Sequence, residues 1–453
     1  MRLLGLVRSE DILDRTIRSP FFTALLMDAV YNRRAQKCSQ EMVMKPDFSR
    51  RSFLTAGLVL PAAGLRTTNN LPFAPEGSQA TPESVKLTYR TLGKTGLKVT
   101  SLAFGCMTTA DPSVIKRAAD IGIIHFDTAR GYQQGNNERM VGVALKDVRQ
   151  KVIISSKSTA RTKEQLLADL DTSLRELGTD YLDIWYLHMK NEPEQMTPDL
   201  LEAQRIAKQS GKIRFAGVST HFNMDKMLAH LSTLGQIDVV LTTYNFAMRS
   251  VDAGMNKNPD APKTDMTEAI RSARKAGLGI VAMKVMAGGV NRVQRGDRLY
   301  GANPQELSKR LSQPGVAVAA LKWALKNESV DTAIVCMTDH DQLDENLRAM
   351  AETYTEKDEN LLTAQLASIG PDYCRMCGSC GGVCDKGVPV PDVLRFLTYA
   401  EGYGQFALAR QRFLEMPEPA RDVRCRDCAS CSFKCAYGVE VRDRLTHAQE
   451  ILA

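Results

Sequence analysis

The sequence predicts an α/β protein, a (β/α)8 barrel of the TIM-barrel architecture followed by a small and mostly helical domain. Between residues 86 and 355, short β-branched apolar runs alternate with amphipathic helical patterns, and eight such runs can be counted. Residues 356–453 hold eight of the eleven cysteines, in two short runs separated by further helical patterns. A chain of 453 residues with 43% hydrophobic and 25% charged residues has room for both domains.

The N-terminal region carries a motif typical of export. Residues 49–66 contain the adjacent arginines Arg50 and Arg51, followed by the weakly apolar stretch AGLVLPAAGL. This segment resembles a twin-arginine export signal, which predicts a periplasmic or otherwise exported protein. The apolar stretch of about ten residues is shorter than the roughly twenty that a spanning helix needs, so no stable membrane span is expected. The alternative is a cytoplasmic protein in which both arginines are solvated residues before a buried helix.

The segments on either side of this motif have different compositions. Residues 67–85 are rich in Pro, Asn, Thr, Ser and Gly without apolar periodicity, which predicts a disordered linker. Residues 1–48 form an N-terminal extension, and a true start at Met42 or Met44 is the alternative, because such signals begin close to the arginine pair.

The net charge of +7 does not indicate a nucleic-acid partner. Residues 1–66 contain eleven Lys and Arg against six Asp and Glu, so this leader carries most of the excess. The rest of the chain is nearly neutral and shows no concentrated basic patch with a reading motif, which argues against nucleic-acid binding.

The barrel prediction rests on the strands and helices that are expected along the chain. A hairpin is expected around residues 89–100, and Gly-terminated helical patterns occupy residues 163–178, 199–211 and 266–277. The eight strands are expected at 101–105, 123–128, 151–157, 183–188, 213–219, 238–244, 279–284 and 332–337. In such a barrel, active sites lie at the C-terminal ends of the strands.

Four polar residues follow three successive strands. Asp127 and Tyr132 come at and after the end of the second strand, Lys157 ends the third, and His188 ends the fourth. On these residues the chain, over roughly residues 86–355, resembles the aldo-keto reductase family, whose catalytic Asp, Tyr, Lys and His occur at these strand ends in this order. The resemblance implies hydride transfer between a nicotinamide and a small carbonyl or alcohol substrate.

The chemistry of a carbonyl reduction gives each residue a role. Hydride addition builds negative charge on oxygen, and a tyrosine with a pKa near 10 is a weak proton donor at neutral pH. Lys157 is expected to lower the pKa of Tyr132, Asp127 to hold Lys157, and His188 to orient the substrate oxygen. The alternative is a structural Asp127–Lys157 ion pair, with the two rings filling the barrel mouth.

The resemblance extends to the nucleotide contacts, with departures. It places Glu345 and Asn346 against the adenine and Ser219 against the carboxamide of NAD(P)(H). Cys336 and Gln342 occupy the places where many members hold the 2′-phosphate of NADP with cations, which leaves the choice between NADP and NAD open. Further departures are Thr220, Leu241, Met283 and Lys284.

The two cysteine runs, residues 374–384 and 425–435, each read Cys-x2-Cys-x2-Cys-x3-Cys. In two-cluster ferredoxins, three cysteines of a run ligate one [4Fe-4S] cluster and the fourth ligates the other. The first predicted set is Cys374, Cys377, Cys380 and Cys435; the second is Cys425, Cys428, Cys431 and Cys384. Zinc is the competing metal, but zinc sites use pairs of cysteines. Helices are expected at residues 393–400 and 405–416, between the two ligand loops.

Two functions fit these features. The first is an aldo-keto-reductase-type oxidoreductase whose two [4Fe-4S] clusters exchange electrons with a redox partner protein. The second is an electron-transfer iron-sulfur protein that uses the barrel as a docking scaffold. The predicted tetrad favours the first function, and the altered nucleotide positions favour the second.

Overall fold

The computed structural model describes residues 86–248, 266–287, 314–369, 374–376, 380, 384–401, 403, 405–429, 431–435 and 437–453. The predicted extension, export signal and linker (residues 1–85) and the predicted ligand Cys377 lie outside the described residues.

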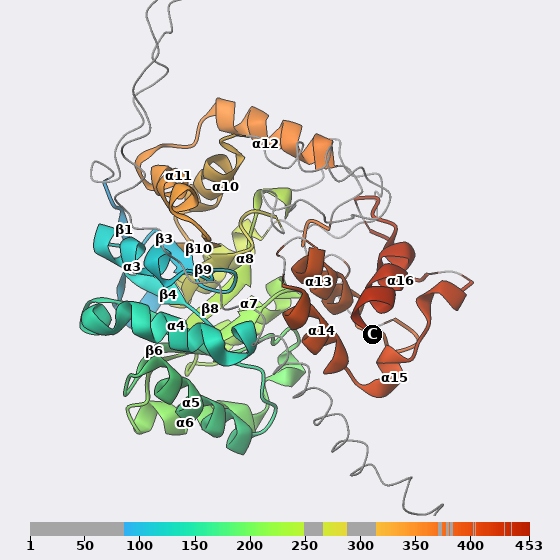
Figure 1. The fold of residues 1–453 in the computed structure, drawn as a ribbon, viewed down its shortest axis with the longest axis horizontal. Helices are drawn as coiled ribbons and strands as arrows, with labels where there is room; N and C mark the ends of the chain where they lie inside the picture. The colour runs from blue at the N-terminus through green and yellow to red at the C-terminus, as the bar shows by residue number, and fades with distance from the viewer. Residues whose placement is uncertain are drawn as a thin grey trace, which may run out of the picture. The chain divides into compact units, whose positions relative to one another are not determined.

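Eight parallel strands close a barrel in the order β10-β3-β4-β5-β6-β7-β8-β9, which confirms the predicted barrel (Figure 1). The strands are β3 (Leu102–Gly105), β4 (His125–Asp127), β5 (Ile153–Ser158), β6 (Leu182–Leu187), β7 (Ile213–Thr220), β8 (Val239–Thr243), β9 (Gly279–Met283) and β10 (Thr332–Cys336). The predicted hairpin is also present, as β1 (Tyr89–Thr91) paired antiparallel with β2 (Lys98–Thr100).

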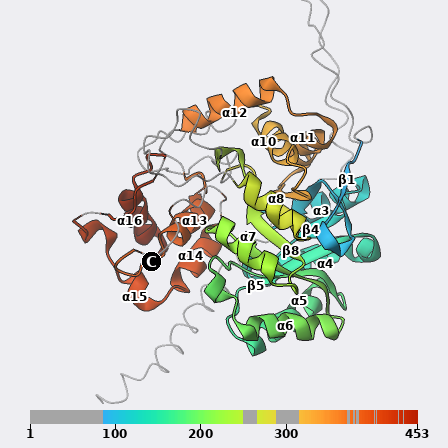
Figure 2. The same ribbon diagram turned by 180° about the vertical axis from the view of Figure 1, so that it is seen from behind.

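Helices follow the strands and cover the barrel from outside. They are α3 (Pro112–Ile121), α4 (Asn136–Leu145), α5 (Lys163–Leu177), α6 (Pro198–Gln209), α7 (Met224–Thr233), α8 (Thr267–Lys275), α10 (Val316–Leu325) and α11 (His340–Ala351), with α12 (Glu356–Ile369) after them. Figure 2 shows α7 and α8 packed side by side on the outer face. No helix in the described ranges combines the length and apolar character needed to cross a membrane.

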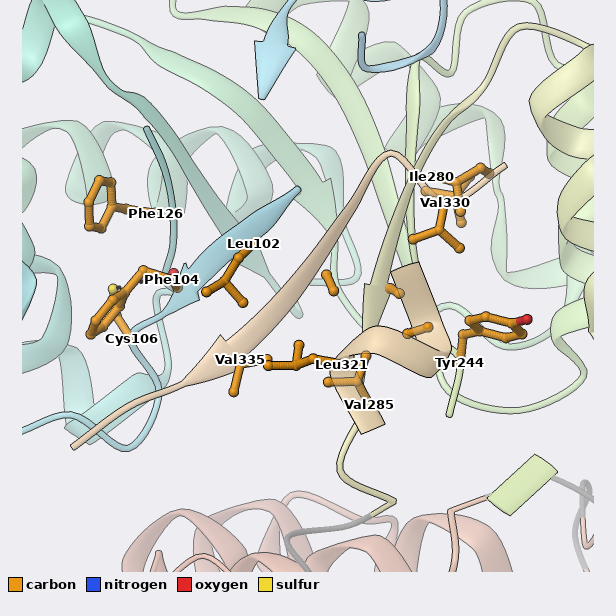
Figure 3. Packing of buried hydrophobic residues seen from close by; sticks show 14 of the residues in the cluster. Leu102, Phe104, Cys106, Phe126, Tyr244, Ile280, Val285, Leu321, Val330 and Val335 are labelled. Carbon is orange, nitrogen blue, oxygen red and sulfur yellow. Dashed lines mark hydrogen bonds between the residues drawn. The ribbon is translucent and has the colours of Figure 1, made fainter. Parts of the chain in front are cut away.

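Side chains alternate between the inside and the outside of the barrel, as the strand period of two requires. On β6, Ile184 and Tyr186 belong to the inner cluster, whereas Trp185 and Leu187 belong to the core under the helices. Phe104 and Phe126 are paired in register on neighbouring strands and stack with ring centroids 5.8 Å apart in that outer core (Figure 3). Burying each such side chain contributes about 1.5–3 kcal/mol.

The C-terminal residues form a separate helical group. It contains α13 (Val390–Glu401), α14 (Phe406–Leu414), the short α15 (Glu418–Arg421) and α16 (Val441–Leu452), so the two helices expected between the cysteine runs are present. Helices α13, α14 and α16 pack on one another (Figure 1). Their core includes Met107 of the barrel, and Tyr132 and Met189 pack against it. The helical group therefore lies on the barrel mouth, where the strands end.

Candidate active site

The four predicted catalytic side chains converge at the C-terminal ends of β4, β5 and β6. Lys157 on β5 lies in register with the inward-facing Tyr186, and Asp127 ends β4. The Lys157 Nζ is 2.5 Å from the Asp127 Oδ2 and 5.0 Å from the centre of the Tyr132 ring. The rings of Tyr132 and His188 meet edge to face with centroids 6.2 Å apart.

Asp127 and Lys157 form a buried ion pair that satisfies most of their hydrogen-bonding capacity. Lys157 also donates to the backbone carbonyl of Thr128, at 2.5 Å, and the hydroxyl of Ser155 donates to the Asp127 Oδ1, at 2.7 Å. Asp127 is only 4% exposed and Lys157 only 1%. Because both are held from several sides, the ammonium has a defined position beside the Tyr132 ring.

The structure corrects the expected effect on Tyr132. Burial raises the pKa of Tyr132 well above its usual value of 10, and the charge of Asp127 raises it further. The predicted net lowering of this pKa is therefore wrong, because burial and the charge of Asp127 outweigh any lowering by the Lys157 ammonium. Arg412 acts in the opposite direction and lowers the pKa of this phenol. The phenol is protonated at neutral pH, which is the form that a proton donor needs.

His188 is neutral in this environment. Burial lowers its pKa well below 6.5, and the positive charges of Lys157, Arg412, Arg395 and Lys284 lower it further. A neutral imidazole carries one N–H and one acceptor nitrogen, so it can donate a hydrogen bond to a substrate oxygen without carrying charge.

Several side chains from α13 and α14, which sequence reasoning missed, surround this site. Arg412 on α14 donates to the hydroxyl of Thr159, after β5, at 3.1 Å. Arg395 on α13 donates to the sulfur of Met189 at 3.8 Å. The only sequence signal was that both arginines fall within apolar helical patterns; their target could not be read from it.

Nearby cations lower the pKa of Tyr399 below its usual value of 10. Burial acts to raise its pKa, but Lys284, Arg395 and Arg412 outweigh burial. The Lys284 Nζ lies 4.8 Å and 4.9 Å from the ring centres of Tyr399 and Tyr403, which stack on each other. Lys284 itself has a left-handed backbone with φ of 59°, strain of a kind that clusters at functional sites.

A cavity of about 350 Å³ opens from this site towards α11. The catalytic residues Asp127 and Tyr132 line this cavity, and so do the predicted adenine contacts Glu345 and Asn346. The Asn346 Oδ1 is buried and has no hydrogen-bond partner among the described residues, so an acceptor is left for a ligand. Ser219 is not among the lining residues; its hydroxyl accepts a hydrogen bond from the Met189 N–H at 2.9 Å.

Five of the six residues that depart from the family pattern, all except Thr220, also line this cavity. They are Leu241, Met283, Lys284, Cys336 and Gln342. The Gln342 side chain donates to the Asp339 carboxylate at 2.7 Å, and that carboxylate caps the N-terminus of α11. Of the described residues that line the cavity, Lys284 is the only cation.

The structure brings together cysteines from both runs. Cys374, Cys380 and Cys435 line one cavity of about 50 Å³. In the second predicted set, burial raises the pKa of the Cys425 thiol to about 11, and the neighbouring Cys428, Cys384 and Cys431 raise it too. Among the described residues, no three His, Cys, Asp or Glu side chains are placed to hold a single metal ion.

The fold and the polar residues at the barrel mouth define a barrel oxidoreductase. The aldo/keto reductase family model matches residues 108–366, and this chain belongs to that family. L-glyceraldehyde 3-phosphate reductase of Escherichia coli is 27% identical over 60% of this chain and 90% of its own length. L-galactose dehydrogenase of Arabidopsis thaliana is 28% identical over 59% of this chain and 89% of its own.

A solved structure agrees with the fold. The holo form of an aldo-keto reductase from Bacillus halodurans matches 62% of this chain and 96% of its own, with a TM-score of 0.50 and 24% identity. Residues 374–453, which contain the cysteine runs, lie outside the range that the family model matches.

Proposed function

We propose that this protein interconverts a small carbonyl compound and its alcohol with NAD(P)(H), and that two [4Fe-4S] clusters in its C-terminal domain exchange electrons with a partner protein. The observation that carries the proposal is the convergence of Asp127, Tyr132, Lys157 and His188 beside a cavity that extends to Asn346. Residues 49–66 support export of this protein by the twin-arginine route.

The residues divide the work of a carbonyl reduction. A bound reduced nicotinamide supplies hydride to the carbonyl carbon. The phenol of Tyr132 gives its proton to the carbonyl oxygen, while His188 donates a hydrogen bond to that oxygen and orients it. Lys157 stabilises the phenolate that Tyr132 becomes, and Asp127 holds Lys157 in position. In the reverse direction, Tyr132 accepts the proton of the alcohol.

The cavity favours a nucleotide without a 2′-phosphate. Cys336 and Gln342 line it where the family resemblance implies cations, and the Gln342 amide is engaged by Asp339. Asp339 adds negative charge near that position, which would repel a phosphate. We therefore infer a preference for NAD over NADP.

The cysteine positions fit two clusters with crossed ligands. Cys435 of the second run shares a cavity with Cys374 and Cys380 of the first, and Cys384 of the first run lies near Cys425 of the second. A cubane is larger than one ion, so its four thiolates stand farther apart than the ligands of zinc, whose Zn–S bonds are about 2.3 Å. When bound, such clusters supply one-electron transfer.

The alternative, an iron-sulfur electron carrier with the barrel as a docking scaffold, is favoured by Leu241, Met283 and Cys336 in the nucleotide cavity. Tyr132→Phe separates the two functions, and Tyr89→Phe on the exposed hairpin is the matched control. Under our proposal, Tyr132→Phe lowers kcat for carbonyl reduction about 10²- to 10⁴-fold. The control keeps its rate, and both variants keep their clusters.

The assay is an anaerobic titration of cluster-loaded protein with NADH and with NADPH, followed by nucleotide fluorescence and by cluster absorbance. Carbonyl turnover that is equal in Tyr132→Phe and the control would reject the reductase assignment. Purified protein that contains zinc and no iron would reject the clusters.

A further inference from the structure

The cavity that Cys374, Cys380 and Cys435 line also receives two polar side chains from other parts of the fold. His221 follows β7 of the barrel, and Arg395 lies on α13. Neither belongs to a cysteine run. The inference drawn from them rests on the proposed function, because it concerns the first of the two proposed clusters.

Both side chains present a buried nitrogen without a partner. Among the described residues, neither the Arg395 Nε nor the His221 Nδ1 has a hydrogen-bond partner. Arg395 is 2% exposed and His221 is 8% exposed, so water does not readily replace the missing partner. A buried polar group without a hydrogen-bond partner costs about 1–3 kcal/mol, and native proteins rarely leave two such groups beside one cavity without a ligand.

The remaining contacts of Arg395 hold its guanidinium in place. Its Nη2 lies 2.5 Å from the Asp392 Oδ1 and donates to the Met189 sulfur at 3.8 Å. The side chain also forms a hydrogen bond with Tyr399. The Nε–H is a guanidinium donor without a partner among the described residues, on a side chain that lines the cavity.

We propose that Arg395 and His221 donate hydrogen bonds to the sulfur atoms of the proposed [4Fe-4S] cluster whose described ligands are Cys374, Cys380 and Cys435, and thereby raise the reduction potential of that cluster above the value it would have without them. Reduction adds negative charge to a cluster, so hydrogen-bond donors to its sulfurs stabilise the reduced form more than the oxidised form. The positive charge of Arg395 acts in the same direction.

The cavity that Cys374, Cys380 and Cys435 line also lies next to the active site. The His221 ring lies 6.3 Å, centre to centre, from the ring of His188. Tyr403, which lines the nucleotide cavity, donates to the sulfur of Met376, which lines the cysteine cavity, at 4.0 Å. The proposed donors therefore adjust the potential of a cluster that lies beside the barrel residues.

The second cluster offers a matched control. Lys386 is exposed, and its Nζ lies 3.2 Å from the sulfur of Cys428, a ligand of the second proposed set. Arg395→Met and Lys386→Met each remove one cation beside one set of cysteines. The two variants therefore test the same physical effect at different clusters.

The experiment is an anaerobic redox titration of the full chain, followed by electron paramagnetic resonance of both clusters. We expect Arg395→Met and His221→Leu each to lower one of the two potentials and leave the other unchanged. Arg395→Lys, which keeps the charge without the Nε–H, should lower the same potential by less. Lys386→Met should lower only the other potential.

Iron content separates the failure of this inference from the failure of the proposed function. If wild-type protein contains two clusters and both Arg395→Met and His221→Leu leave both potentials unchanged, the hydrogen bonds do not exist. If Arg395→Met does not load iron, His221→Leu decides, since it leaves the Arg395–Asp392 ion pair in place. Wild-type protein without iron would reject the clusters themselves.

Discussion

The buried ion pair between Asp127 and Lys157 gives the sharpest test of how this site is built. We expect Lys157→Met to destabilise the fold strongly, because it leaves the Asp127 carboxylate buried and without its cation. Adding Asp127→Asn should recover most of the loss, since no unpaired charge then remains, and the amide oxygen can still accept a hydrogen bond from Ser155.

The magnitude follows from the geometry. Two unit charges 2.5 Å apart attract by about 7 kcal/mol at an effective dielectric constant of about 20. The cost of desolvating both charges offsets part of this attraction, so breaking such a pair on one side costs about 3–5 kcal/mol. The exposed pair Lys116–Asp120, with 62% and 54% exposed side chains, sets the contrast: Lys116→Met should cost less than about 1 kcal/mol.

The assay is guanidinium unfolding of wild type, the two single lysine variants and the Asp127→Asn/Lys157→Met double variant, followed by circular dichroism. Carbonyl reduction should be lost in both variants at Lys157, because neither retains the ammonium beside Tyr132. A Lys157→Met protein as stable as Lys116→Met, or a double variant less stable than Lys157→Met, would refute this account of the pair.

Three further predictions concern stability and binding. Burial lowers the pKa of His125 to about 4, so its contribution to stability is complete above about pH 6.5 and is lost as the pH falls towards 4. We expect the free energy of unfolding to fall by about 3 kcal/mol over that range, and to fall less in His125→Gln. An equal fall in both proteins between pH 7 and pH 5 would contradict this. Asn346→Ala should weaken nucleotide binding about tenfold in a fluorescence titration, since it removes an acceptor at the cavity, and unchanged binding would place the nucleotide elsewhere. Gly142→Ala should destabilise the fold by about 1–3 kcal/mol in guanidinium unfolding, because the new Cβ would clash with the Leu177 carbonyl oxygen. Val143→Ala, at an exposed position, is the control, and equal unfolding midpoints for the two variants would show that the helices separate freely.

The barrel and its polar strand ends were predictable because their signals are local. Each strand is a short apolar run, and the polar residue at its end follows from the same few residues of sequence. Parallel strands bring their C-terminal ends to one face, so Asp127, Lys157 and His188 had to approach one another once the barrel closed.

The pKa of Tyr132 was not predictable in the same way. Its direction depends first on burial and then on the nearby groups Asp127 and Arg412, and these are matters of distance and solvent access rather than of residue type. The tyrosine that cations do make more acidic, Tyr399, belongs to a helix whose sequence shows only an apolar pattern.

The sequence by itself determined the order of the barrel elements, the residues at its mouth and the spacing of the cysteine runs, because these depend on neighbours along the chain. Only the tertiary structure decided that α13 and α14 bring Arg395 and Arg412 to that mouth. It also decided that His221 of the barrel shares a cavity with Cys374 and Cys435. These contacts join residues that lie far apart along the chain, and they form only where two hydrophobic faces pack together, which no local pattern specifies.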